Sequence, residues 1–175
     1  MFFIFVAHNV ISHFDTEQMK QLIFTLCLLS IATSCCKKDN VILSTTNYLI
    51  FGHFYGECIG EGCIEIFRLE QNQLLEDTKD IYPYSTSFYN GNYNLLSQKK
   101  FNSAKDILNF FPNDLLLELS TVIGQPDAGD WGGLYIEYNY NGSRKFWLVD
   151  KMKSNVPSKY HAFIDKVNEK IQLIQ

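Results

Sequence analysis

Alternating apolar and polar positions near the start of the regular pattern predict a first β-hairpin. Its strands are the aromatic stretch at positions 47–55 and the β-favouring run at positions 63–69, joined by a glycine-rich segment. A four-residue turn between them sets the register, and side chains then alternate between the two faces of the sheet. In that register the opposed pairs are Cys58 with Cys63, Phe54 with Phe67, and Gly52 with Leu69. We assign these pairs to the core face and His53, beside Arg68, to the other face.

A second hairpin is predicted further along the chain, between positions 134–140 and 144–149. The connecting dipeptide Asn141-Gly142 tolerates the positive φ angles of a tight type I′ turn. Such a turn pairs Ile136 with Trp147 and Tyr135 with Leu148. Because both faces of these strands carry apolar side chains, we expect them to be central in the sheet or covered on both sides.

Helical spacing of apolar residues predicts three helices, and two shorter runs at 73–76 and 93–96 favour strands. The first helix begins at Ser103 and ends near Phe111, and the second runs from Pro112 to Ile123, where Gly124 stops it. The third begins at Ser158 and has the clearest amphipathic pattern. Its apolar stripe consists of Tyr160, Phe163, Ile164, Val167, Ile171 and Ile174, and its outward residues are Lys159, Asp165, Lys166, Glu169 and Lys170.

The order of these elements, strands, helices, strands and helix, predicts an α+β fold. The simplest form is an antiparallel sheet of two or more hairpins with helices mainly on one face. About 140 residues follow position 34, enough for a single domain with a real core, which we place at residues 47–175.

The segment from Met19 to Asn40 has the layout of an export signal. It has a positive start at Lys20, an apolar run from Leu22 to Ala32, and small residues before Cys35. The apolar run is about half of the roughly 20 residues that a membrane-spanning helix needs. Residues 1–18 are not needed by such a signal, so we interpret them as an overlong start, with translation from Met19, and exclude them from the fold.

Ala32-Thr33-Ser34-Cys35 resembles the lipobox of bacterial lipoproteins, whose pattern is Leu, a small residue, Gly, Ala or Ser, then Cys. Ser34 and Cys35 match, and Ala32 departs from the favoured Leu. The resemblance covers the first fifth of the chain and implies removal of residues 19–34 and acylation of Cys35. It further implies a cell-envelope protein anchored to membrane lipid and facing the periplasm or cell surface, and we expect the outer rather than the inner membrane. Modification of Cys36 instead, and a plain secretory signal, are the alternatives.

Composition and charge limit the classes of partner that the chain can bind. The chain has 15 Lys and Arg against 19 Asp and Glu, a net charge of −4, and no basic cluster interleaved with aromatic residues. Such a chain lacks the electrostatic pattern of a nucleic-acid-binding protein. We find no cofactor motif. Residues 35–46, polar and without periodicity, are predicted to be the lipidated N-terminus and a linker.

Cys58 and Cys63 are the first candidate site. Opposed residues of an antiparallel pair have Cα atoms about 4.5–5.5 Å apart, which suits a disulfide, and an exported protein meets oxidising conditions. We therefore predict a structural disulfide, with free buried thiols or a redox or metal role as alternatives. A zinc site with His53 is not predicted, because His53 points away from the cysteines in the predicted register.

Asp127 and Asp130, in the loop at positions 125–133, are the second candidate site. Their carboxylates could bind a cation or serve as the acid and base of a hydrolase. The simpler interpretation is that they bond to local backbone amides while Trp131 closes over the edge of the core. The sequence contains no nucleophile motif that would select the hydrolase over cation binding or over bonding to backbone amides.

These features favour a lipid-anchored envelope protein whose domain is a non-enzymatic binding or interaction module. The alternative is a small envelope hydrolase with its site near positions 125–133, and a third is a structural or inhibitory module. A cleft holding His53, Glu57, Asp127 and Asp130 would favour the enzyme. An exposed apolar surface without convergent polar groups would favour the binding module.

Overall fold

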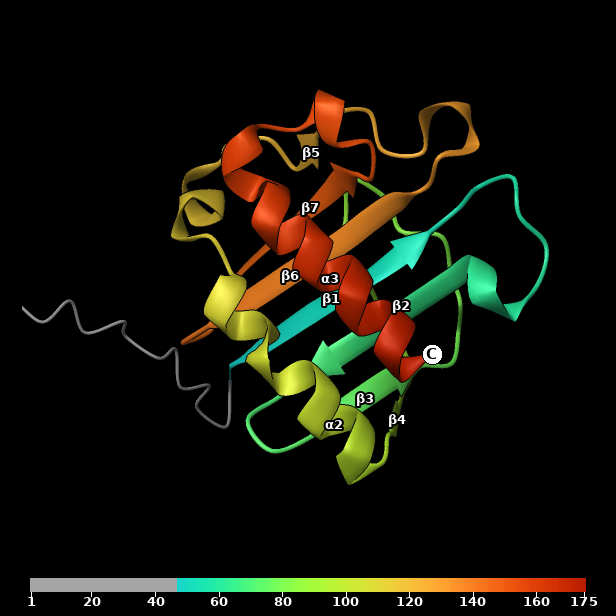
Figure 1. Ribbon diagram of the computed structural model, residues 1–175, viewed down its shortest axis with the longest axis vertical. Coiled ribbons are helices and arrows are strands. Elements are labelled where there is room, and N and C mark those ends of the chain that lie inside the picture. Colours follow the sequence, from blue (N-terminus) through green and yellow to red (C-terminus); the bar gives the residue numbers. More distant parts are fainter. Residues whose placement is uncertain (1–46) are drawn as a thin grey trace, which may run out of the picture. The chain divides into compact units, whose positions relative to one another are not determined.

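A mixed sheet of seven strands runs through residues 47–175, the part of the chain that the computed structural model describes (Figure 1). Its strand order is β4-β3-β2-β1-β6-β7-β5. Neighbouring strands are antiparallel except β5 and β7, which run parallel. The predicted α+β class is therefore confirmed. The predicted export signal, the lipidation of Cys35 and the linker lie outside the described residues.

The elements follow one another with short connections except for the loop between β3 and β4. The strands are β1 (Tyr48–Phe54), β2 (Ile64–Leu69), β3 (Leu74–Asp77), β4 (Tyr93–Leu95), β5 (Val122–Ile123), β6 (Gly133–Tyr140) and β7 (Ser143–Asp150). The α-helices are α2 (Gln98–Ala104) and α3 (His161–Ile174). Short 3₁₀ turns occur at η2 (Glu61–Cys63), η3 (Lys105–Phe110), η4 (Asn113–Leu117), η5 (Ala128–Asp130), η6 (Lys153–Asn155) and η7 (Ser158–Tyr160).

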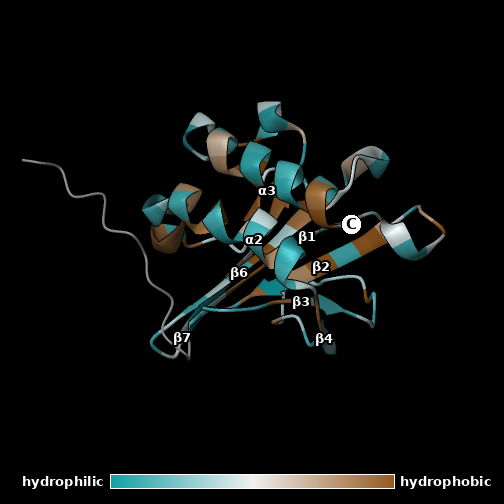
Figure 2. Cartoon of the chain, turned by 60° about the horizontal axis from the view of Figure 1, so that its bottom comes forward, coloured by the Kyte–Doolittle hydropathy of each residue, from teal (hydrophilic) through white to brown (hydrophobic). Residues whose placement is uncertain are grey.

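Both faces of the sheet are covered. Helices α2 and α3 pack on one face, which we call the helix face (Figure 2). The long loop at 78–92 packs on the opposite face, which we call the loop face. Because side chains alternate along each strand, the central strands supply two cores. The helix-face core includes Leu49, Phe51, Phe67, Leu69, Leu134, Ile136, Trp147 and Val149, and the loop-face core includes Tyr48, Ile50, Phe54, Ile66, Tyr135, Phe146 and Leu148.

The second hairpin forms as predicted. β6 and β7 pair Ile136 with Trp147 and Tyr135 with Leu148. Asn141 and Gly142 both have positive φ, at 51° and 84°, as the predicted turn requires. β6 lies between β1 and β7 and is buried on both sides over most of its length, which is why both of its faces are apolar.

The first hairpin has a different register from the one predicted. Phe54 pairs with Ile64, and Phe67 pairs with Phe51. The turn is longer than four residues because the chain closes through η2, which shifts the register by three positions. An odd shift moves side chains to the opposite face, so Phe54 lies on the loop face and His53 on the helix face, opposite Glu65 rather than Arg68.

The region between β4 and β6 is less helical than predicted. α2 begins at Gln98, where the Ser97 side chain accepts a hydrogen bond from the backbone N–H of Lys100, and not at Ser103. The second predicted helix does not form: η4 ends at Leu117, and Val122–Ile123 becomes strand β5 along β7. Val122 and Ile123 are β-branched residues that gain backbone hydrogen bonds at the edge of the sheet, and this tertiary pairing outweighs their helical spacing.

The C-terminal helix is confirmed, with every residue of its predicted apolar stripe buried. Lys170 is the exception among the predicted outward residues. Its ammonium lies 2.7 Å from a carboxylate oxygen of Asp106, and its side chain is only 7 % exposed. This ion pair joins α3 to η3. Within residues 47–175, no helix has the length and apolar content needed to span a bilayer.

Gly52 lies where β1 and β2 approach most closely. A Cβ at this position would lie 2.1 Å from the carbonyl oxygen of Glu65 and 2.7 Å from the Cα of Ile66, both backbone atoms. Gly52→Ala should therefore lower the free energy of unfolding by about 1–3 kcal/mol or more, because the strands must separate. The measurement is the urea midpoint of the disulfide-bonded protein.

Gly62→Ala is the matched control, since a Cβ there meets no atom within 4 Å. We expect it to change the free energy of unfolding by no more than about 0.5 kcal/mol. Equal effects of the two substitutions would contradict the close approach at Gly52.

Candidate functional site

Three segments meet at the end of the sheet where β1 stops. They are residues 55–63, residues 81–84 and residues 125–132, and together we call them the loop end. The first joins β1 to β2, the second is part of the long loop over the loop face, and the third precedes β6. Loops held at one end of a rigid sheet are a common arrangement for recognition surfaces.

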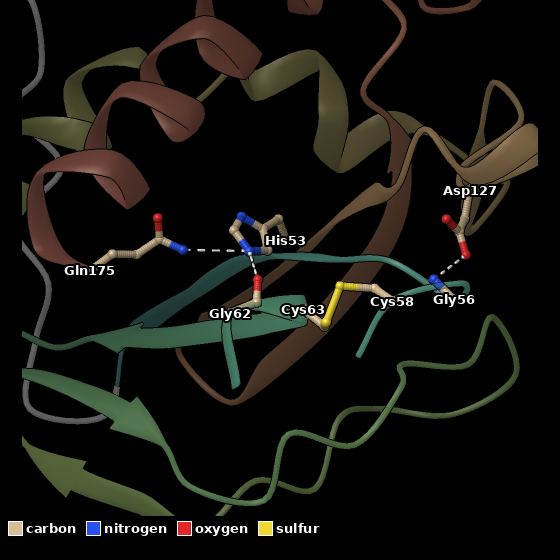
Figure 3. Close-up of a disulfide and its surroundings, with 7 residues drawn as sticks. All are labelled: His53, Gly56, Cys58, Gly62, Cys63, Asp127 and Gln175. Carbon is tan, nitrogen blue, oxygen red and sulfur yellow. Dashed lines mark hydrogen bonds between the residues drawn. A yellow bond between two sulfur atoms is a disulfide. The ribbon is translucent and has the colours of Figure 1, made fainter. Parts of the chain in front are cut away.

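Asp127 connects all three segments through its carboxylate. One oxygen, Oδ2, accepts hydrogen bonds from the Gly56 backbone N–H and the Tyr82 hydroxyl, both at 2.8 Å. The other, Oδ1, accepts from the Gly132 backbone N–H at 3.1 Å. Figure 3 shows Asp127 facing Gly56. The predicted bond from Asp127 to a local backbone amide is present at Gly132, whereas Gly56 and Tyr82 are partners far away in the sequence.

The Cys58–Cys63 disulfide closes the first segment (Figure 3). The Cα atoms are 5.7 Å apart, and the backbone N–H of Tyr55 donates to the carbonyl of Cys63 at 3.0 Å. The predicted disulfide is thus present, although the two cysteines lie in the turn beyond the paired strands. Because it ties together residues that are five apart, it fixes the shape of the turn more than it stabilises the whole chain.

His53 is buried below the helix layer and does not belong to the surface of the loop end. Its Nε2 lies 3.0 Å from the carbonyl oxygen of Gly62 and 3.5 Å from the side-chain nitrogen of Gln175 (Figure 3). Burial lowers the pKa of His53, which keeps the ring neutral at pH 7. His53 therefore fixes the turn and the C-terminus, and its contacts are structural.

Glu65, opposite His53, is a carboxyl group that sequence reasoning missed. Burial, reinforced by the nearby charges of Glu76, Asp80 and Glu61, raises the pKa of Glu65 to about 7. A carboxyl group with a pKa near neutrality is a feature of many acid-base sites. In this structure the Glu65 carboxyl group lies near the acids Glu76, Asp80 and Glu61 and opposite the buried His53. Within residues 47–175, no three His, Cys, Asp or Glu side chains are grouped in a way that could hold a metal ion.

Three large apolar side chains are exposed at the loop end, beside the exposed acids Glu57, Glu61 and Asp130. Ile59 is 103 % exposed, Tyr84 is 63 % exposed and Trp131 is 62 % exposed. The expectation that Trp131 closes over the core edge is wrong, because Tyr55 packs against Gly132 and occupies that place: a Cβ on Gly132 would lie 2.4 Å from the Tyr55 ring. Asp130 is exposed, with a φ of 66°.

Aromatic packing supports the second segment from below. The Tyr82 ring lies 5.0 Å from the Phe54 ring, edge to face, and 6.2 Å from the Tyr84 ring. Burial, the hydrogen bond to Asp127 and the charge of Asp127 raise the pKa of Tyr82 to about 12. Tyr84, next to a hollow of about 160 Å³ in the same loop, is therefore held on a rigid base.

A buried polar network fixes the long loop to the sheet. The Glu137 carboxylate, fully buried, accepts hydrogen bonds from the Tyr48 hydroxyl at 2.9 Å, the Tyr135 hydroxyl at 2.6 Å and the Arg144 guanidinium at 2.7 Å. The Tyr135 hydroxyl in turn accepts from the backbone N–H of Tyr89, within the loop. Sequence reasoning missed this network. Its signal was an acidic residue in the middle of a strand that is apolar on both faces.

Asp77 closes the base of the same loop. Its carboxylate accepts hydrogen bonds from the Tyr89 hydroxyl and the backbone N–H of Asn92, each at 2.5 Å. It also accepts hydrogen bonds from the backbone N–H groups of Lys79 and Asp80, each at 3.1 Å. Burial, the hydrogen bond to Asp77 and the negative charge of Asp77 raise the pKa of Tyr89 far above its usual value. The loop carrying the second segment is thus fixed at both its start and its end.

Asp127→Asn tests whether this carboxylate organises the loop end. Asparagine tolerates the left-handed backbone at this position, where φ is 62°, so the change mainly removes charge and acceptor capacity. Burial, the largest cause of the raised pKa of Tyr82, remains in this variant. We expect that pKa to fall below about 12, because the charge of Asp127 is lost and its hydrogen bond is weakened. The measurement is an NMR pH titration of the labelled Tyr82 ring.

Asp130→Asn, an exposed neighbour with positive φ, is the control and should leave the Tyr82 titration unchanged. An identical Tyr82 pKa in the wild type and Asp127→Asn would show that the carboxylate does not connect the segments.

Comparison of the chain with known protein families, with curated proteins and with solved structures found no match.

Proposed function

We propose that this protein is a lipid-anchored lipoprotein of the bacterial cell envelope, and that its domain is a non-enzymatic module that binds a partner through the loop end. The observation that carries the binding role is the apolar surface of Ile59, Tyr84 and Trp131 on three segments joined by Asp127. Exposed aromatic side chains on a rigid support are typical of binding surfaces.

The signal and the disulfide support the envelope location. The lipobox-like Ala32-Thr33-Ser34-Cys35 is preceded by an apolar run of export length. The Cys58–Cys63 disulfide fits an oxidising compartment outside the cytoplasm. The outer membrane remains our expectation for the anchor.

The geometry favours binding over hydrolysis. A hydrolase near the 125–133 loop would need a carboxylate free to act as base beside a second group. Asp127 already accepts three hydrogen bonds, and His53 is buried against Gly62. Glu57 and Asp130 are exposed, yet neither joins these two in a cluster able to hold a metal ion among residues 47–175.

Intact mass analysis of the membrane-purified protein tests the anchor. We expect an N-terminus at Cys35 with a mass increase of acyl chains, and a gain of two hydrogens on reduction of the Cys58–Cys63 bond. Cys35→Ser should leave the leader uncleaved and remove the acyl mass from the protein. Cys36→Ser is the matched control and should stay anchored. A native product without lipid, or acylation only at Cys36, would contradict the proposed attachment.

Photo-crosslinking in intact cells tests the binding surface. With a photoreactive phenylalanine at Trp131, we expect a defined covalent adduct with a partner, and its loss when Tyr84→Ala and Ile59→Ser are added. The same probe at Leu95, which is 67 % exposed on edge strand β4, should give no such adduct. Equal adducts from both positions, or none from position 131, would argue against the loop end as the binding surface.

A further inference from the structure

The chain enters the domain at the end of the sheet opposite the loop end. β1 begins at Tyr48, beside Asn139 near the end of β6, and the side chain of Asn47 accepts a hydrogen bond from Asn141 in the hairpin turn at 2.8 Å. The loop end lies past Phe54, where β1 stops. We call the end near Tyr48 and Asn141 the tether end (Figure 1).

Four exposed apolar side chains lie around the tether end, on η3, on the segment that includes and follows η4, and on the last residue of β6. They are Phe110, Leu117, Leu119 and Tyr140, and we call them the tether-end rim. Leu117 is 77 % exposed and Leu119 is 99 % exposed.

Contacts with the sheet place these residues together. The Lys145 ammonium donates a hydrogen bond to the backbone carbonyl of Leu116. In the sheet, Lys145 of β7 lies opposite Tyr138 of β6, and Tyr138 lies opposite Leu49 near the start of β1. The Phe111 ring lies 4.6 Å from the Tyr138 ring, and the Tyr138 ring stacks with that of Tyr140 at 6.2 Å. Phe111, Tyr138 and Leu116 thus connect the segments that carry the four rim residues.

Glu118 lies between the two exposed leucines. Its carboxylate accepts the hydroxyl of Tyr160 and lies 3.2 Å from the Lys159 ammonium. Its backbone is extended, with φ −65° and ψ 135°. Neighbours of an inward side chain in extended backbone project the other way. Glu118 is held by these contacts, while Leu117 and Leu119 on either side of it are exposed.

Several charged side chains around the rim have a partner, whereas the Lys145 ammonium is bonded to the backbone carbonyl of Leu116. Lys159 pairs with Glu118 and lies 3.8 Å from Asp114, and the Lys166 ammonium lies 4.6 Å from the centre of the Phe110 ring. Long lysine side chains can cover apolar surface while their ammonium groups stay in water. A surface of this kind suits the interface of an uncharged bilayer, where apolar insertion and not attraction to anionic lipid provides the affinity.

We propose that the tether-end rim inserts into the headgroup region of the phospholipid bilayer that holds the anchor, with Leu117 and Leu119 entering deepest. This inference rests on the proposed lipid attachment at Cys35. Positions 36–46, between Cys35 and Asn47, span at most about 40 Å when fully extended. An anchored domain therefore keeps its tether end close to the membrane, and a weak insertion becomes effectively intramolecular. The loop end then faces away from the lipid.

Tryptophan quenching in vesicles tests this orientation. The full lipoprotein carrying Leu119→Trp is reconstituted in phosphatidylcholine vesicles with either ordinary or brominated acyl chains. The rim should enter the interface to about 5–10 Å, so the added emission should fall at least about twofold in brominated lipid. Raising the salt concentration should not reverse the quenching, because apolar insertion and not attraction to charged lipid provides the affinity.

The chain supplies its own controls. Trp131 lies at the loop end and Trp147 in the core, so the wild-type emission should be almost the same in both lipids. Ile59→Trp, a fully exposed substitution at the loop end, should also be insensitive to bromine.

The outcomes separate the two proposals. If mass analysis shows lipid on Cys35 and the protein floats with vesicles, yet Leu119→Trp is not quenched, rim insertion is wrong and the anchor stands. If Leu119→Trp shifts to the blue without bromine quenching and the protein crosslinks as a dimer, a second copy covers the rim, and bilayer insertion is also wrong. If Cys35 carries no lipid, the proposed lipid anchor and the proposed insertion of the tether-end rim both fail.

Discussion

The fold depends on the burial of one charge, the carboxylate of Glu137, in the middle of a sheet covered on both faces. A buried carboxylate is tolerated only when it is paired and hydrogen-bonded, because desolvation otherwise disfavours its charged form. Here Arg144 supplies the opposite charge, and the Tyr48 and Tyr135 hydroxyls supply the remaining bonds. Burial and this carboxylate raise the pKa of Tyr48 to about 12, so its hydroxyl remains a donor. The Tyr135 hydroxyl then holds the backbone of Tyr89, and with it the loop that covers this face.

That constraint extends to the loop end. The loop fixed through Tyr89 and Asp77 includes Tyr82, whose hydroxyl donates to Asp127. Asp127 in turn holds the turn closed by the Cys58–Cys63 disulfide, through the backbone N–H of Gly56. The apolar side chains that form the proposed binding surface thus stand on a connected set of hydrogen bonds that starts in the middle of the sheet. A surface fixed in this way loses little conformational freedom on binding, which favours affinity.

An antiparallel sheet also gives the molecule two distinct ends. β1 carries the chain from the tether end to the loop end, so the length of the strand separates Tyr48 from the proposed binding surface beyond Phe54. Exposed Leu117 and Leu119 lie toward one end and exposed Trp131 at the other. In the proposed orientation, the same strand that centres the sheet also sets the distance between membrane and partner.

The sequence by itself determined the elements whose signals are local. The Asn141-Gly142 turn fixes its hairpin because few dipeptides tolerate positive φ at both positions, and the stripe from Tyr160 to Ile174 fixes its helix because each member faces the core. The Cys58–Cys63 disulfide was predicted from a hairpin register that does not form, and it is still present because the two residues are only five apart in the sequence. Only the tertiary structure decided the rest. The register of β1 with β2 depends on how η2 closes the turn. Val122 forms a strand because the edge of β7 is free to pair with it. Asp127 joins the loops because its carboxylate accepts a hydrogen bond from the backbone N–H of Gly56, which is distant in the sequence. These choices are made by contacts between segments far apart in the chain, and periodicity within a single segment carries no information about them.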